Sequence, residues 1–413
     1  MDLAFNTLTA FTAAASVVVL YKLILKIFEN RFLAFSTALL FSTMPVYLSI
    51  TTHSMIHAFS VLTSLLSFYF LILAVSDENL AFYLYSAIFF IISVSSRFPN
   101  ILLLLPLSII FFQPLIDSHF KPGFINKNRF TQEMILFWAP IISFLIFTLV
   151  FQQDMIIGKA GYDVFLGFFS PVLFLAVNTI IKNVGLLGWF LLLLGTSKVR
   201  YYNKKLYSIS LILWMLLLFF FYGNIISYSD RFLSIILPII AFFISVSIDR
   251  IRHYNRFLSV LVLIFILSSM FYTVLPIIWD RHNYSAQKEY ALWLKEQVPS
   301  ESVIIVMDDA PFIEYYGGLT TKEHPIGDIE KTVKWVGDVS QLLNSGRPVY
   351  IVESGFTYDP EGIFLDALLD NFNLSLIGSH VNEDYHRASI TRHKYDSRLI
   401  KIVQKKDSTA WNT

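Results

Sequence analysis

The stretch YSDRFLSIILPIIAFFISVSIDRIRHYNR, residues 228–256, decides the fold of this chain. Its apolar centre, residues 232–248, contains 17 residues. A helix rises about 1.5 Å per residue, so this length is just enough to cross a hydrocarbon core of about 30 Å. Basic residues mark the cytoplasmic end of a span, and three arginines follow this one: Arg250, Arg252 and Arg256. Asp230 and Arg231, which precede the span, are therefore expected on the external face.

The composition predicts a membrane protein with several spans. Of the 413 residues, 55% are hydrophobic and 15% are charged, and the mean hydropathy is +0.61. Globular proteins carry about 25% charged residues. The net charge of +1 gives no indication of a nucleic-acid partner. The absence of cysteine excludes disulfides, thiolate metal sites and cysteine nucleophiles.

Ten apolar stretches predict membrane helices: 8–28, 32–50, 56–75, 80–95, 98–116, 134–151, 184–197, 206–222, 232–248 and 257–278. A further apolar piece, 163–183, contains Pro171. We interpret it as a helix that lies at the external interface or dips into it. An eleventh span there would reverse the orientation of everything before it.

Counting basic residues decides between these topologies. With ten spans, the predicted cytoplasmic turns hold 13 basic residues: Lys22, Lys26, Arg31, Lys121, Lys127, Arg129, Lys198, Arg200, Lys204, Lys205, Arg250, Arg252 and Arg256. The predicted external turns hold 4: Arg97, Lys159, Lys182 and Arg231. An excess of basic residues on the cytoplasmic side is what the positive-inside rule expects, so the ten-span topology is favoured. It places both termini on the extracytoplasmic side of the cell membrane.

The chain is expected to form two domains, a membrane domain at 1–279 and an extracytoplasmic domain at 280–413. The second domain alternates strand and helix patterns. The predicted helices are 287–298, 328–344 and 360–371, and the predicted strands are 302–307, 348–353, 373–378 and 399–403. This alternation indicates a small α/β domain with a partly parallel sheet. The sequons at Asn283 and Asn373 make glycosylation possible there.

Charged groups at helix ends near a membrane are candidates for function, because a charge there is energetically unfavourable unless it is paired or hydrated. The external set comprises His53, His57, Arg97, Asp154, Lys159, Asp163, Lys182, Asp230 and Arg231. Cations, imidazoles and carboxylates at one surface would suit a lipid head group that carries phosphate. Arginine offers phosphate a fork of donors and lysine a point charge.

Each candidate also has a simpler interpretation. Arg97, which lies before Pro99, could simply extend its side chain to the membrane interface without binding a ligand. Asp230 and Arg231 could form a local ion pair at a helix start. His53 and His57 are spaced for a shared metal, but no third ligand is evident, so we interpret them, with Asp230, as polar residues that line a cavity.

Other chemistry finds little support in the sequence. Asp308 and Asp309 follow a predicted strand, where α/β sheets place ligands, but a carboxylate pair at a loop start has little specificity. The usual nucleotide-binding and hydrolase motifs, G-x-G-x-x-G, the Walker loop, G-x-S-x-G and H-E-x-x-H, do not occur. No cofactor is required by the sequence, and a divalent metal remains possible.

Three stretches resemble the membrane glycosyltransferases of the GT-C fold, in the protein-mannosyltransferase and aminoarabinose-transferase group. The first is Asn6–Ile50, in which VLYKLILKIFENRFLAFSTALLFSTMPVYL is similar to the second and third spans of that family, with an apolar helix that closes on Pro45. Ser96-Arg97-Phe98-Pro99 with the following apolar run is the second stretch. The third is Asp230-Arg231-Phe232-Leu233 with Pro238, which resembles the family's R-Y-L-x-x-x-x-P entry to a late span.

The resemblance implies transfer of a sugar from a polyprenyl-phosphate donor to a protein or glycan acceptor on the external face. Arg97, Lys159 and Arg231 would bind the donor phosphate and stabilise it as it leaves. The family's general base is an acidic residue in its first external loop. This chain begins at what resembles the second span, so that loop is missing and the catalytic residue stays unknown. His57 stands where relatives often show aspartate.

Two explanations of the missing loop stay open: further sequence precedes Met1, or the protein no longer catalyses. The leading hypothesis is a glycosyltransferase that depends on a lipid carrier. The second is a catalytically inactive subunit that binds the carrier or assists assembly. The third is a polysaccharide transporter or polymerase, which the lack of repeats and of charges deep within the spans disfavours.

Overall fold

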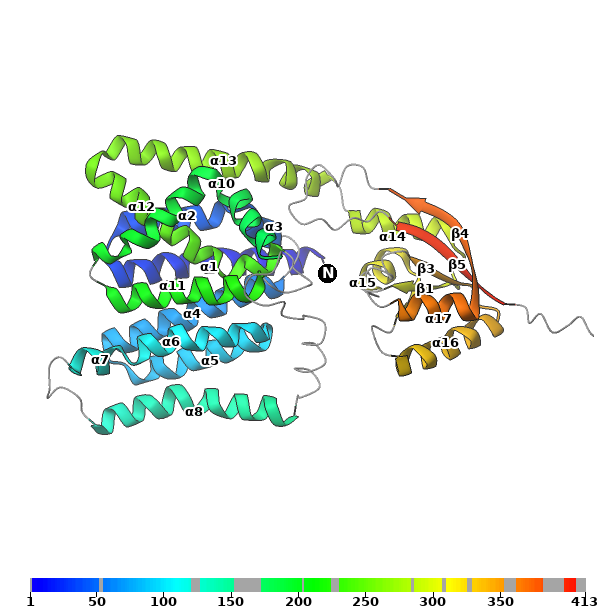
Figure 1. The fold of residues 1–413 in the computed structure, drawn as a ribbon, viewed down its shortest axis with the longest axis horizontal. Coiled ribbons are helices and arrows are strands. Elements are labelled where there is room, and N and C mark those ends of the chain that lie inside the picture. The colour runs from blue at the N-terminus through cyan, green and yellow to red at the C-terminus, as the bar shows by residue number, and fades with distance from the viewer. Residues whose placement is uncertain are drawn as a thin grey trace, which may run out of the picture. The chain divides into compact units, whose positions relative to one another are not determined.

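The computed structural model describes residues 2–51, 55–119, 127–151, 172–202, 204–223, 230–283, 286–306, 310–324, 329–352, 362–381 and 397–405. It divides into two compact units, Met1–Leu275 and Pro276–Thr413. The first is a bundle of helices and the second combines helices with a small sheet (Figure 1). Each unit is described by itself.

The first unit contains the helices that the sequence predicts to lie in the membrane. They are α1 (Asp2–Phe28), α2 (Arg31–Thr43), α3 (Pro45–Thr51), α4 (Met55–Asp77), α5 (Leu80–Ser96), η1 (Phe98–Leu103), α6 (Leu104–Phe111), α7 (Gln113–His119), α8 (Lys127–Phe151), α10 (Val172–Lys198), η2 (Val199–Tyr202), α11 (Lys205–Tyr222), η3 (Asp230–Ile235), α12 (Leu237–Tyr254) and α13 (Arg256–Asn283).

All ten predicted stretches coincide with helices of this bundle. Within the described residues, seven helices are long and apolar enough to cross a membrane, or eight if the bent pair α2–α3 counts as one span. Helix α5, with 17 residues, is apolar but shorter. The described half of the piece interpreted as interfacial, residues 172–183, is continuous with the next predicted span and forms the first half of α10, which breaks at Gly185.

Helix α12 is the central element of the bundle. Every residue from Leu237 to Asp249 is buried. A helix that is apolar on all sides is stable only when other helices surround it. Helix α10 covers one side, with the hydroxyl of Ser247 donating to the Leu191 carbonyl at 2.6 Å. Helices α1 and α2 cover another, and Phe28 stacks on Phe242 at 4.9 Å between ring centres.

A glycine lets α10 approach the backbone of α12. A Cβ atom built on Gly195 would lie 1.8 Å from the carbonyl oxygen of Phe243. Any other residue would force the two helices apart. The close approach therefore depends on the missing side chain at this one position.

Two helices break beside each other at Pro45 and Gly185. Helices α2 and α3 meet at an angle of 62°, where Pro45 cannot donate a backbone hydrogen bond. The amide oxygen of Asn183 accepts the N–H of Val46 at 2.9 Å, so α10 satisfies a donor that the break leaves open. Two residues further on, Gly185 has φ +70° and ψ 171°, which breaks α10 itself.

A buried carboxylate ties three elements together at the end of the bundle where α12 ends. Asp249 accepts hydrogen bonds from Asn30 Nδ2 at 2.8 Å and from the Tyr202 hydroxyl at 2.6 Å. Arg252 and His253 lie 3.7 and 3.8 Å from its oxygens. Burial and the hydrogen bond to Asp249 raise the pKa of Tyr202 above its usual value, so this hydroxyl stays a donor.

The second unit contains a five-stranded sheet with the order β2-β1-β3-β5-β4. Its elements are α14 (Ala286–Gln297), β1 (Val303–Val306), α15 (Ala310–Phe312), η4 (Ile313–Gly317), β2 (Thr320–Glu323), α16 (Ile329–Asn344), β3 (Val349–Val352), α17 (Ile363–Asn371), β4 (Phe372–His380) and β5 (Ser397–Gln404). Strands β2, β1 and β3 pair in parallel, and β5 runs antiparallel to both of its neighbours, β3 and β4. The expected partly parallel sheet is therefore present.

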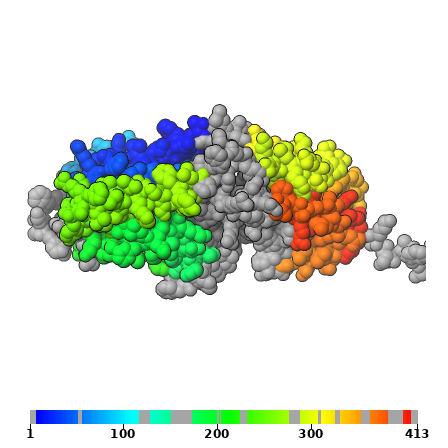
Figure 2. All heavy atoms as spheres, turned by 90° about the horizontal axis from the view of Figure 1, so that it is seen from above, coloured from blue at the N-terminus to red at the C-terminus, as the bar shows by residue number. Residues whose placement is uncertain are grey.

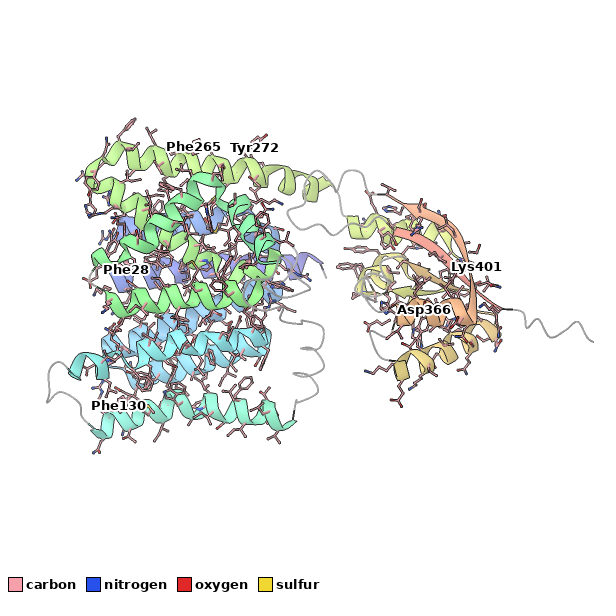
Figure 3. The ribbon with its side chains drawn as sticks, viewed as in Figure 1. Phe28, Phe130, Phe265, Tyr272, Asp366 and Lys401 are labelled. Carbon is pink, nitrogen blue, oxygen red and sulfur yellow. The ribbon has the colours of Figure 1, made fainter. Side chains whose placement is uncertain are left out.

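Helices cover both faces of this sheet, and alternate residues of its strands point into two cores. Ile304 and Val306 pack with Tyr290 and Leu294 of α14. Ile305, between them in the sequence, packs on the other face with residues of α16 and α17, including Trp335 and Phe364. Figure 3 labels Asp366 of α17 and Lys401 of β5 on this unit. A strand buried on both faces reads as a continuous apolar run, as 303–306 does.

We predict that Gly195→Ala destabilises the membrane unit by about 3 kcal/mol or more, because the new methyl group would overlap the backbone of α12. Thermal unfolding of the purified protein in detergent would measure the loss. Ser197→Ala, two residues further along the same helix, removes only an exposed hydroxyl that bonds within α10, and it serves as the control. Equal melting temperatures of the two variants would contradict the close approach.

Candidate functional site

Arg97 lies where α5 ends and η1 begins. Its backbone is extended, with φ −151° and ψ 106°, and its N–H donates to the Ser93 carbonyl at 3.0 Å. Its own carbonyl accepts the N–H of Asn100 at 3.0 Å. Pro99 in the first turn of η1 starts a new helix in a new direction. The chain is thus anchored on both sides of Arg97.

His57, in the first turn of α4, contacts the Arg97 side chain directly. Arg97 Nη1 lies 2.5 Å from His57 Nδ1. The imidazole is 7% exposed, so this contact is sheltered from water. Helices α4 and α5 bring together two residues that are 40 positions apart in the sequence.

Two neighbouring aromatic rings contact the Arg97 guanidinium. Its central carbon lies 4.5 Å from the ring centre of Phe232 in η3 and 5.0 Å from that of Tyr222 at the end of α11. The two rings lie 5.7 Å apart, with an interplanar angle of 32°. Each contact stabilises a guanidinium by about 0.5–2 kcal/mol, depending on how far it is removed from water.

A second guanidinium, that of Arg231, approaches the same ring. Its central carbon lies 5.8 Å from the ring centre of Phe232. Its Nε atom is buried and has no hydrogen-bond partner among the described residues. A buried N–H without an acceptor costs about 1–3 kcal/mol, and an anion beside Arg231 would remove that cost.

A network of buried polar groups lies next to Arg97 between α4, α5 and η1. Asn100 Nδ2 donates to Ser60 Oγ at 2.7 Å and to Ser93 Oγ at 2.9 Å. Ser64 Oγ lies 2.7 Å from Ser93 Oγ. Such hydrogen bonds between helices hold a membrane bundle together where apolar packing alone gives little specificity. The network fixes the helix pair that carries His57 and Arg97.

The site therefore presents two permanent cations and a buried imidazole around Phe232. Arginine stays protonated at any physiological pH and forms paired hydrogen bonds with phosphate and carboxylate oxygens. The described residues contain no group of three or more His, Asp or Glu that could hold a metal. The chemistry present is suited to binding an anion.

The structure brings together three of the residues proposed from the sequence, namely Arg97, Arg231 and His57. His53 and Lys159 lie outside the described residues, as do Asp308 and Asp309. Asp230 starts η3, and its side chain is not described. The ion pair considered for Asp230 and Arg231 and the shared metal considered for His53 and His57 are therefore untested.

Sequence reasoning gave no role to Tyr222 and Asn100, and it named Phe232 only as part of the stretch 230–233 that carries the resemblance. Both rings sit inside apolar runs, where an aromatic residue resembles ordinary lipid-facing or core residues. Asn100 follows Pro99 directly, and an amide between a helix-starting proline and a long apolar run is the sequence signal for a buried polar contact at this position.

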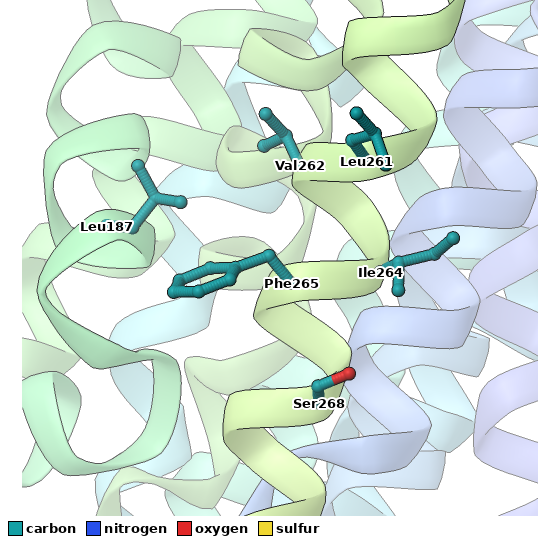
Figure 4. A pocket seen from close by; sticks show the side chains of 6 residues that line it. All are labelled: Leu187, Leu261, Val262, Ile264, Phe265 and Ser268. Carbon is teal, nitrogen blue, oxygen red and sulfur yellow. The ribbon is translucent and has the colours of Figure 1, made fainter.

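A separate apolar groove of about 530 Å³ lies between α10 and α13. It is lined by Leu187, Leu261, Val262, Ile264, Phe265 and Ser268 (Figure 4). The two helices lie side by side on one face of the unit (Figure 2). Phe265 and Tyr272 of α13 are 61% and 84% exposed (Figure 3). In a membrane, this face would meet hydrocarbon chains.

The chain resembles solved structures of known transferases. ArnT from Cupriavidus metallidurans bound to undecaprenyl phosphate matches 96% of this chain and 83% of its own length, with a TM-score of 0.58 and 9% sequence identity. The oligosaccharyltransferase of Archaeoglobus fulgidus in its apo form matches 90% of this chain and 62% of its own length, with a TM-score of 0.56 and 12% identity. The structure of ArnT from Cupriavidus metallidurans in the apo state matches with a TM-score of 0.53 and 11% sequence identity.

These proteins are GT-C glycosyltransferases. The chain has the GT-C fold. With identities of 9–12% the likeness concerns architecture, a polytopic helical unit followed by a small sheet domain. No protein-family model matches the sequence, and no curated protein matches it. The resemblance noted from residues 6–50, 96–99 and 230–238 is thereby confirmed at the level of the fold.

We predict that Asn100→Ala destabilises the protein by about 1–3 kcal/mol, because Ser60 and Ser93 lose a buried hydrogen-bond partner. Ser96→Ala is the control, since the Ser96 hydroxyl bonds only within α5, to the Ser93 carbonyl. Thermal unfolding in detergent measures both variants. If Asn100→Ala costs no more than Ser96→Ala, the network does not hold the site.

Proposed function

We propose that the protein transfers a sugar from a polyprenyl-phosphate donor to an acceptor on the external face of the membrane. The observation that carries this proposal is the placement of Arg97 and Arg231 on one aromatic ring, Phe232, within a GT-C fold. The same fold occurs in a transferase whose structure contains undecaprenyl phosphate.

Arg97 and Arg231 would bind the phosphate of the donor. When the bond between sugar and phosphate breaks, negative charge builds up on the leaving phosphate. Cations fixed in advance stabilise that charge without a reorganisation cost at the moment of reaction. The buried Nε of Arg231 supplies a donor that a phosphate oxygen would satisfy. Lys159 remains a proposed third cation.

The external location rests on the distribution of basic residues. Arg97 and Arg231 lie at the ends of helices opposite to those followed by the basic turns, such as 250–256. The protein or glycan that accepts the sugar is left open, and no residue is assigned as the general base.

Carrier binding without transfer is the second candidate. It is favoured by the engagement of His57 Nδ1 with Arg97, which occupies the ring nitrogen that would otherwise accept a proton. A purified protein that binds a polyprenyl-phosphate sugar but never releases polyprenyl phosphate, with any acceptor fraction offered, would support this candidate over transfer.

We predict that Arg97→Ala and Arg231→Ala each lower the transfer rate by about a hundredfold or more, the usual loss when one fixed donor to a developing charge is removed. Proteoliposomes with a radiolabelled polyprenyl-phosphate sugar would measure this. Arg256→Ala, an exposed arginine at the start of α13, is the matched control and should keep full activity. Full activity in Arg231→Ala would rule out its assignment to the donor phosphate.

A further inference from the structure

The hydrogen bond between Arg97 and His57 determines which nitrogen of the imidazole carries the proton. A guanidinium has only N–H donors and no acceptor. Since Arg97 Nη1 lies 2.5 Å from Nδ1, the bond forms only if Nδ1 is unprotonated. The neutral ring then carries its proton on Nε2. A doubly protonated ring would set donor against donor and add a positive charge beside Arg97 and Arg231.

The contacts of Arg97 restrict its guanidinium in two independent ways. Phe232 and Tyr222 contact it with their rings at 4.5 and 5.0 Å and limit its tilt. A ring attracts the cation as a whole and does not select which Nη atom points in which direction. A hydrogen bond from one defined nitrogen to His57 does. The imidazole is itself placed by burial and by Phe232, whose ring centre lies 6.2 Å away.

We infer that His57 is a positioning residue that holds the Arg97 guanidinium through Nδ1 while its ring is neutral with the proton on Nε2. It touches Arg97 and acts through it. The benefit for phosphate binding rests on the proposed function, because a preoriented fork loses less rotational freedom when it binds an anion. The orientation of Arg97 itself does not depend on any ligand.

Solid-state NMR of the full chain in lipid bilayers, labelled with ¹³C and ¹⁵N at histidine and arginine, tests the inference without a ligand. We expect an unprotonated Nδ1 at His57, a protonated Nε2, and a through-space contact between Nδ1 and Arg97 Nη1. The Arg97 Nη signals should be individually resolved. His57→Ala and Arg97→Lys assign the signals. A protonated Nδ1 would overturn the inference.

Two substitutions separate the two ring nitrogens. The amide oxygen of asparagine lies as far from Cβ as Nδ1 does, whereas the amide of glutamine reaches the place of Nε2. His57→Asn should therefore leave the Arg97 Nη1 signal close to that of the unaltered protein, and His57→Gln and His57→Ala should shift and broaden it, because the hydrogen bond to Nδ1 is lost. Ser67→Ala is the control, because it removes a buried hydrogen bond between α4 and α5 away from Arg97. Equal signals in the Asn and Gln variants would overturn the positioning role.

Binding of a polyprenyl monophosphate in detergent links this orientation to the proposed function. His57→Gln should weaken binding about tenfold, the effect of one hydrogen bond to a charged group, and His57→Asn by less than about threefold. Undiminished binding in His57→Gln would overturn the positioning of Arg97 for phosphate. If the unaltered protein does not bind the lipid, the proposed function fails, while the NMR result still decides the inference about His57.

Discussion

A guanidinium keeps its positive charge, so wherever it is removed from water it needs hydrogen-bond acceptors or aromatic faces around it. The surroundings of Arg97 provide both. One acceptor comes from α4, and two rings come from α11 and η3. These elements lie far apart in the sequence, so the site exists only when the bundle is assembled. The serine and asparagine network beside it fixes the α4–α5 pair at the same end.

A buried acidic side chain, that of Asp249, lies where α12 ends. Asp249 is 1% exposed, and a carboxylate buried to that degree is tolerated only with donors around it. Asn30 and Tyr202 provide them from the α1–α2 turn and from η2. The most buried helix of the bundle thus begins beside a cationic site and ends on an anionic one. The hydrogen bonds of Asp249 at one end, and the contact of Phe232 in the preceding η3 with Arg97 at the other, limit sliding of this helix along its own axis.

The sequence was sufficient for the class of fold, because spans and basic turns obey strong physical limits on what a bilayer accepts. It also predicted four of the five strands, since runs such as 303–306 and 349–352 are continuous and apolar. Strand β2, Thr-Thr-Lys-Glu, was not predicted because it is a short, half-exposed edge strand with no apolar pattern. Arg97, Arg231 and His57 could be proposed as charged groups at helix ends. Their grouping around Phe232 could not, because packing between distant helices is not encoded in local periodicity.

The paired helix breaks at Pro45 and Gly185 constrain how these positions can change in evolution. Asn183 accepts a donor that exists only because the helix pair α2–α3 is broken, and it stands two residues from the break in α10. Straightening α2–α3 would return the Val46 N–H to its own helix and leave the Asn183 oxygen buried without its donor. Reshaping α10 at Gly185 would withdraw that oxygen from Val46. Proline, asparagine and glycine at these three positions are therefore expected to be kept or exchanged together as the protein diverges.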